Sequence, residues 1–151
     1  MKNSAPIAAL IAAGIALSGC SYIEEGIAEA TADTYYATLT GAQEVGPGDP
    51  DGTARAEISI SDELGQICYD INNVRAIGPV TAAHIHEGAA GTNGPPVFTL
   101  TANGNRNYVG CDDAPQALQD RIARTPTQFY INLHTAEFPQ GAIRGQLGFD
   151  N

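Results

Sequence analysis

From residue 35 onward, apolar and polar side chains alternate with a period of two, and turn-forming residues interrupt this alternation at short intervals. Within residues 53–60, alanine and isoleucine occupy every second position, and Arg55, Glu57 and Ser59 occupy the positions between them. Successive side chains of a β-strand point to opposite faces, so this pattern predicts a strand that is buried on one face. Its repetition predicts an all-β fold, an antiparallel Greek-key sandwich or barrel.

The alternation divides the domain into six or seven expected strands. They cover residues 35–40, 53–60, 66–71, 82–87, 97–102, 128–135 and 142–149, with a short edge piece at 107–111. Residues 114–124 depart from the period of two, because Ala114, Leu118 and Ile122 recur at a spacing of four. We therefore expect one short helix that covers an open end of the core, with Asp112 or Asp113 as its N-cap.

The composition limits the classes of partner. The chain has 7 basic and 17 acidic residues, a formal net charge of −10. Such a surface repels phosphate backbones and attracts cations, so nucleic acid is not an expected partner. The 17 glycines and 9 prolines also suit short strands joined by tight turns.

The N-terminal residues have the features of an export signal. Lys2 precedes an apolar run over residues 6–17, which is shorter than the roughly 20 residues of a membrane-spanning helix. The tetrapeptide Leu17-Ser18-Gly19-Cys20 resembles the bacterial lipobox, which implies that Cys20 is lipidated. The expected parts are a lipoprotein signal peptide (1–19), an acidic tether that begins at Cys20 (20–34) and one domain (35–149). An ordinary signal peptide or an uncleaved anchor is the alternative.

Lipidation would attach the protein to the cell envelope, on the outer membrane if the cell has two membranes. It would also leave Cys68 and Cys111 as the only thiols of an exported chain. In an oxidising compartment we expect these two cysteines to form a disulfide. Two buried free thiols are the alternative, and a metal site is less favoured because neither cysteine belongs to a Cys-x-x-Cys pair.

The three histidines of the chain, His84, His86 and His134, are all expected on the outer face of the sheet. His84 and His86 flank Ile85, and His134 alternates with the apolar residues of strand 128–135, so all three should point away from the core. If the two strands are neighbours, the rings converge beneath loop 88–96. Such a trio would suit copper or zinc. Alternatively, the histidines only hydrogen-bond the loop.

Five ordered motifs resemble the CHRD domain, a module repeated in the animal protein chordin and found in many bacterial exported proteins. They are LTGAQEV at 39–45, AHIHEG at 83–88, NGPPV at 93–97, YINLHT at 130–135 and GAIRGQL at 141–147. The resemblance implies a β-fold and a non-enzymatic binding module, with a protein partner in the periplasm or outside the cell. Glu44 and Arg144 lie in these motifs, and we expect them to share an ion pair or a hydrogen-bond cluster. Alternatively, Arg144 contacts only loop carbonyls.

A weaker similarity links the histidines to the copper side of copper/zinc superoxide dismutase. There His84, His86 and His134 would match copper ligands, but the bridging histidine and the zinc ligands have no counterpart. Full dismutase activity is therefore not expected. Glu87 or Glu137 would lie near enough to orient a ring.

Two functions follow from these features. The first is a surface-tethered, non-enzymatic binding or adhesion module of the cell envelope. The alternative is a copper- or zinc-binding envelope protein, with a redox role, that uses the three histidines. A hydrolase or nucleotide-binding protein is disfavoured, since the sequence has no Gly-x-Ser-x-Gly elbow and no P-loop.

Replacing Cys20 by serine tests the lipoprotein prediction. The Cys20→Ser protein should either leave the membrane fraction or keep its leader uncut, because no thiol remains to carry the lipid. Membrane fractionation and the intact mass of the mature protein measure both outcomes. A cleaved variant that stays anchored would refute lipidation.

Overall fold

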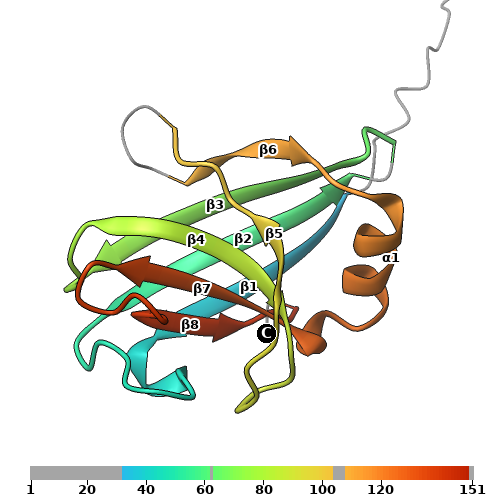
Figure 1. Cartoon of the computed structure of the whole chain (residues 1–151). Helices are drawn as coiled ribbons and strands as arrows, with labels where there is room; N and C mark the ends of the chain where they lie inside the picture. The colour runs from blue at the N-terminus through green and yellow to red at the C-terminus, as the bar shows by residue number, and fades with distance from the viewer. Residues whose placement is uncertain (1–31, 62, 104–107, 150–151) are drawn as a thin grey trace, which may run out of the picture.

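The computed structural model describes residues 32–61, 63–103 and 108–149, and these residues form one antiparallel sheet that curls into a half-barrel with a short helix at one end (Figure 1). The all-β prediction with one short helix is confirmed. The strands are β1 (Asp33–Thr40), β2 (Thr53–Ser61), β3 (Gln66–Arg75), β4 (Val80–Glu87), β5 (Pro96–Thr99), β6 (Val109–Asp113), β7 (Phe129–Thr135) and β8 (Ile143–Gln146). The helix is α1 (Gln116–Arg124), and short 3-10 turns occur at Gly41–Gln43 and Pro126–Gln128.

The sheet has eight strands among the described residues rather than six or seven, in the order β5-β4-β7-β8-β1-β2-β3-β6. The short edge piece proves to be a full strand, β6. The last predicted strand is shorter than expected, because β8 ends at Gln146 and only an isolated bridge from Gly148 to Tyr36 follows.

The segment that follows the edge strand β5 and precedes the opposite edge strand β6 is here called the crossing. Leu100 and Tyr108 of this crossing are buried in the core. The Tyr69 hydroxyl accepts a hydrogen bond from the Thr101 amide (2.9 Å) and donates one to Asp112 (2.6 Å). Tyr69 thereby ties β3 to the crossing segment and to β6.

The concave face of the sheet carries the core that the alternation predicted. Every second side chain is buried along β1, β2 and the first six residues of β3, and Ile85, Ile131 and Leu133 are fully inaccessible. Helix α1 adds Leu118 and Ile122 to the same core. The apolar positions spaced by four therefore do cover the end of the half-barrel.

The predicted N-cap of this helix is wrong. Pro115 occupies the cap position and makes no side-chain cap hydrogen bond. Asp112 and Asp113 belong instead to β6, where their carboxylates accept hydrogen bonds from Tyr69 and Gln66 of the neighbouring strand. Their cross-strand partners hold them away from the helix terminus.

The predicted leader, Cys20 and almost all of the tether lie outside the described residues. Within the described part of the chain, no helix is long and apolar enough to cross a membrane. Lipidation at Cys20 stays a prediction.

Cys68 and Cys111 form a disulfide between β3 and β6. The two cysteines are directly opposite each other in the antiparallel register. The predicted pairing is confirmed, in the form that joins neighbouring strands, and the free-thiol and metal-site alternatives are excluded.

Replacing both cysteines by serine should lower the free energy of unfolding by about 4 kcal/mol, because the disulfide closes a loop of 43 residues in the unfolded chain. Urea unfolding of the Cys68→Ser/Cys111→Ser protein measures the loss. Dithiothreitol should destabilise the wild type similarly and leave the double variant unchanged. A loss well below 1 kcal/mol would contradict this account.

Candidate metal centre

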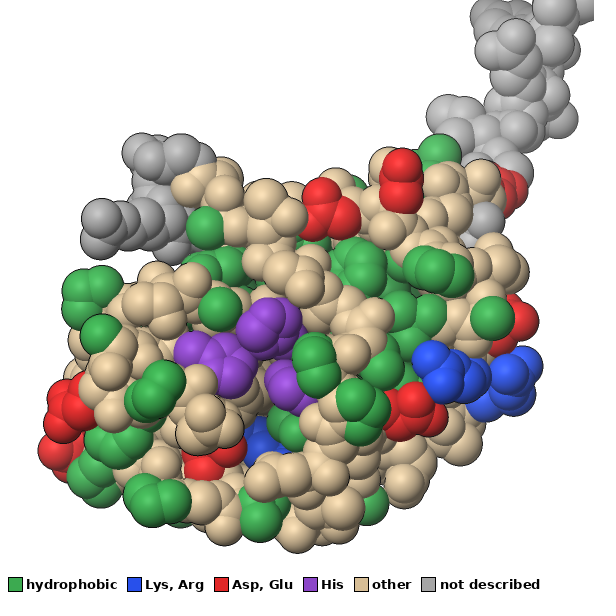
Figure 2. Space-filling view, in the orientation of Figure 1, with side chains coloured by type: hydrophobic (Ala, Val, Ile, Leu, Met, Phe, Trp, Pro, Cys, Tyr) green, Lys and Arg blue, Asp and Glu red, His purple; other side chains and the backbone are tan. Residues whose placement is uncertain are grey.

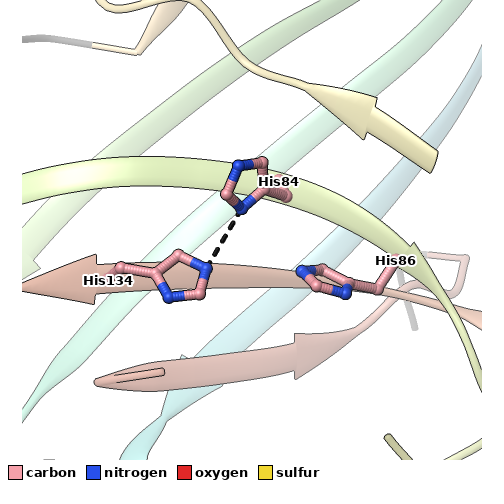
Figure 3. Close-up of side chains that lie close together, drawn as sticks. All are labelled: His84, His86 and His134. Carbon is pink, nitrogen blue, oxygen red and sulfur yellow. Dashed lines mark hydrogen bonds between the residues drawn. The ribbon is translucent and has the colours of Figure 1, made fainter. Parts of the chain in front are cut away.

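The pairing of β4 with β7 brings the three histidines together. His84 is opposite Asn132 and His86 is opposite Tyr130, while His134 is opposite Ala82, one step along the same face. The rings point toward one another from the two strands (Figure 3), and their ligand nitrogens lie within 4.8 Å of one another. The predicted cluster on the face opposite the core is therefore present.

Loops cover part of the sheet face opposite the core, along the outer side of β7. Tyr130 and Asn132 are almost completely buried although they point away from the core. Loop 88–95 reaches Tyr130 through Gly94, and loop 44–52 reaches Asn132 through Glu44. The histidines lie partly buried between these loops, side by side at a hollow of the surface (Figure 2).

Backbone carbonyls fix the orientation of two rings. His86 Nδ1 lies 2.9 Å from the carbonyl oxygen of Gly94, and His134 Nδ1 lies 3.1 Å from that of Pro139. A carbonyl only accepts, so each Nδ1 carries the proton and donates it. A neutral ring protonated at Nδ1 has a lone pair on Nε2. Both Nε2 atoms are thus ready to bind a metal.

His84 faces the other two histidines with its Nδ1 rather than with Nε2. Its Nδ1 lies 3.0 Å from Nε2 of His134 (Figure 3). Because His134 Nε2 has no proton, His84 Nδ1 donates the hydrogen bond. A metal ion at this place would displace the proton from His84 Nδ1, and His84 would then carry its proton on Nε2. The ligands would be His84 Nδ1, His86 Nε2 and His134 Nε2.

Burial lowers the pKa of all three histidines below the ordinary value of 6.5. Neighbouring charge adds to this effect: His134 and His86 lower the pKa of His84, and His134 and Arg144 lower that of His86. Hydrogen bonds to Gly94 and Pro139 oppose the shifts of His86 and His134. The rings are therefore neutral at pH 7, the form that binds metal.

Arg144 contacts the histidine cluster through Tyr130, because the Arg144 guanidinium and the His86 ring both stack on the Tyr130 ring. The guanidinium carbon lies 3.4 Å from the centre of the Tyr130 ring. The His86 ring also stacks on Tyr130, with ring centres 4.8 Å apart and planes tilted by 12°. Arg144 is 1% exposed and donates to the carbonyls of Ala89 (2.9 Å) and Thr92 (3.0 Å). It holds loop 88–95 and the His86 ring in place together.

Glu44 and Arg144 were predicted to share an ion pair or a hydrogen-bond cluster, and the ion pair is not found between these described side chains. Among the described residues the two side chains form no salt bridge, and Arg144 donates to loop carbonyls, Asn93 and Gln146, as in the alternative. Glu44 instead accepts a hydrogen bond from Nδ2 of Asn132. Glu44 thus contacts β7, at the register partner of Arg144.

A cavity of about 210 Å³ opens beside the histidines. Its lining includes His86, His134, Glu44 and Asn132. A larger cavity of about 470 Å³ lies over β1 and β2, but no histidine is among its described lining residues. The smaller cavity is therefore the one that chemistry at the cluster would use.

The profile of the CHRD domain matches residues 35–147, three quarters of the chain and nearly all of the described domain. The chain belongs to the CHRD domain family. Membership indicates a non-catalytic binding module. No curated protein and no solved structure matches the chain, so the weaker similarity to copper/zinc superoxide dismutase has no support from them.

The Gly94 carbonyl that orients His86 belongs to loop 88–96, to which the histidines were expected to hydrogen-bond as an alternative to metal binding. The Pro139 carbonyl and the stack of Tyr130 with Arg144 in this CHRD site were not expected from the sequence. The alternation placed Tyr130 and Asn132 on the face of His134, which was the one available signal. The expected ring partner Glu87 pairs with Arg121 of α1 instead (2.8 Å).

Glu44 should make stability depend on pH in a defined way. Burial raises its pKa from 4.5 to about 7, although Arg144 and the Asn132 hydrogen bond lower it. Between these values the folded state retains a proton that the unfolded chain releases. The resulting stabilisation is complete below pH 4.5 and is lost as pH rises through about 7.

Glu44→Gln removes this titration. Its free energy of unfolding, relative to the wild type, should therefore increase from pH 4.5 to about 7 and then stay level. Urea unfolding across this range measures the difference, in which the histidine titrations common to both proteins cancel. A difference that does not vary with pH would show that burial leaves this carboxyl unaffected.

Proposed function

We propose that this CHRD protein is a metal-binding module that holds one copper or zinc ion through His84, His86 and His134. The observation that carries the proposal is Nε2 of His86, which is buried and has no hydrogen-bond partner among the described residues. A buried polar atom without a partner costs about 1–3 kcal/mol, so its presence calls for a ligand.

The arrangement around this atom favours a metal over a passive hydrogen-bonding role. If the histidines served only to hold loops, their Nδ1 bonds to Gly94 and Pro139 would suffice, and Nε2 of His86 would need no orientation toward the other rings. A histidine that donates Nδ1–H to a backbone carbonyl and presents Nε2 inward is the usual state of a metal ligand.

The electrostatics favour a cation at neutral pH. The rings are neutral because burial lowers the pKa of all three, with a smaller contribution from Arg144 at His86, and the chain as a whole carries a formal charge of −10. Three imidazole nitrogens suit both Zn²⁺ and Cu²⁺, and divalent copper generally binds such sites more tightly than zinc. Three protein ligands leave one coordination position for an exchangeable ligand.

A surface-tethered protein-binding or adhesion module is the second candidate, which CHRD membership favours. A long apolar edge strand would support it, but the edge strands β5 and β6 have only 4 and 5 residues. The two functions are compatible. A lipid on Cys20 would hold the metal module at the surface of the cell envelope, where a periplasmic or extracellular protein would meet it.

Titration of untagged apo protein with Cu(II) and Zn(II) tests the metal proposal. The wild type should bind one ion per chain. His84→Ala and His134→Ala should abolish stoichiometric binding, because each removes a ligand. Isothermal titration calorimetry and metal analysis of the desalted protein provide the readouts.

Gly94→Ala probes the site without touching a ligand. A Cβ at this position would lie 1.6 Å from the carbonyl oxygen of Glu87, so the loop must move and the Gly94 carbonyl must leave His86. Metal affinity should fall about 10- to 100-fold. Gly46→Ala, where a Cβ meets nothing within 4 Å, is the matched control and should bind as the wild type does.

The proposal is refuted if the wild type takes up no metal and the histidine variants only lose stability. The histidines would then act only as anchors for loop 88–95.

A further inference from the structure

Two arginines on the outer face of β2 and β3 have no partner of opposite charge. The described part of the chain contains five arginines, of which Arg121 and Arg124 pair with acidic side chains and Arg144 donates to loop carbonyls. Arg55 and Arg75 have neither a salt bridge nor a side-chain hydrogen bond among the described residues. The positive charge that the described domain leaves uncompensated therefore lies in one place.

Both arginines line a single hollow of about 290 Å³, away from the histidines on β4 and β7. The other hydrogen-bonding side chains of this hollow are Thr38, Thr53 and Asn73, and no acidic residue is among its described lining. The one acid of β2, Glu57, lines the larger cavity of about 470 Å³ instead. In a chain with a formal charge of −10, this hollow presents cations and hydrogen-bond donors only to an anion that contacts it.

A bulge in β3 brings Arg75 to this face of the sheet. Arg55 is opposite Asn72, while Thr53, two residues earlier on β2, is opposite Arg75, three residues further along β3. In a regular register Val74 would be opposite Thr53, and the side chain of Arg75 would point to the other face. The bulge therefore replaces an apolar neighbour of Arg55 by a second cation.

The backbone on either side of Arg75 takes conformations that side chains disfavour. Asn73 has a φ of 51° and Ala76 a φ of 55°, and they are the only non-glycine residues with positive φ in the described part of the chain. Asparagine tolerates this left-handed region, whereas alanine adopts it at a cost in stability. Such conformations gather at ligand-binding sites, where the placement of a side chain serves function. Two like charges in one hollow add a further cost that a bound anion would offset.

We propose that this hollow binds the phosphate group of a phosphate monoester, whose two negative charges Arg55 and Arg75 neutralise. The guanidinium group binds phosphate oxygens bidentately, and the hydroxyls of Thr38 and Thr53 add two donors. A carboxylate has one charge and two oxygens, so a single arginine would satisfy it. The second arginine thus favours a dianion.

The organic part of the ester has room beside the hollow. Thr38 and Arg55 also line the larger cavity over β1 and β2, so the two cavities are neighbours. The lining of the larger cavity includes the exposed aromatic rings of Tyr36 and Phe149 and the carboxylate of Glu57. The rings provide apolar contacts, and Glu57 disfavours a second anionic group. The ligand is therefore an ester with an uncharged organic part, either a soluble molecule or the headgroup of a lipid.

The test titrates the metal-free full chain with glycerol 3-phosphate and follows the amide and arginine side-chain signals by NMR. The signals of Arg55, Arg75 and Thr53 should shift and saturate in the millimolar range or below, and acetate should bind more weakly. Arg55→Gln and Arg75→Gln should each lower the affinity about 10- to 100-fold, because each removes charge-assisted hydrogen bonds. Arg124→Gln removes the same charge from α1 and is the matched control, which should bind as the wild type does.

Two substitutions of Asn73 test the bulge separately from the charges. Asn73→Gly keeps the left-handed backbone accessible and should retain most of the affinity. Asn73→Val disfavours positive φ and should lower the affinity as far as Arg75→Gln does, because Arg75 leaves the hollow. Asn73 is exposed, and thermal unfolding of both variants checks that the domain remains folded.

Vesicles distinguish the two sources of the phosphate. Binding to phosphatidic acid vesicles beyond that to phosphatidylcholine vesicles, with competition by glycerol 3-phosphate, would assign the site to a lipid headgroup. Binding of glycerol 3-phosphate without this vesicle preference would assign it to a soluble ester. The proposal is overturned if the wild type binds neither probe, if the Arg55→Gln/Arg75→Gln protein binds them as the wild type does, or if acetate binds as tightly as glycerol 3-phosphate. None of these outcomes depends on the metal site, because the protein is free of metal throughout.

Discussion

The antiparallel register between β4 and β7 is the constraint on which the rest of the site depends. With Ile85 opposite Ile131, the apolar residues of both strands enter the core and the histidines emerge together on the other face. A shift of one residue in either strand would bury its histidines and expose its isoleucine. The core therefore fixes the site: the free energy of burying these apolar side chains holds the imidazole rings in reach of one another.

The loops over β7 convert this cluster from a surface feature into an ordered site. Each loop contributes backbone atoms: Gly94 and Pro139 orient two rings, and Gly141 packs against the Glu44–Asn132 pair. Arg144 secures one of these loops and stacks on Tyr130, which stacks on His86. A buried cation that donates all its contacts to neutral acceptors is costly, and its cost is offset by the hydrogen bonds and the stack. Arg144 thus acts through Tyr130 to position His86, and it adds to the effect of burial that lowers the pKa of this ring.

Most of the fold followed from alternation, because a half-buried strand repeats its environment at every second residue. Ile85, Ile131 and Leu133 are in the core as expected, and Leu118 and Ile122 place α1 over its end. Predictions about individual polar side chains fared worse. Asp112 and Asp113 cap no helix because Tyr69 and Gln66 hold them, and Glu44 contacts Asn132 rather than Arg144. A polar side chain takes the partner that the tertiary fold brings nearest, and a one-dimensional pattern does not contain that information.

The sequence by itself determined the class of fold, the face on which each histidine lies, the pairing of the two domain cysteines and the family of the domain. These properties depend on periodicity, on residue type and on ordered motifs, all of which are local to the chain. Only the tertiary structure decided that β4 and β7 are neighbours, that Nε2 of His86 has no hydrogen-bond partner among the described residues and that Asn132 lies buried beside a cavity. Those properties arise from contacts between residues far apart in the chain, such as 50 residues for His84 and His134 and 88 for Glu44 and Asn132, and they exist only where long-range packing brings such segments together.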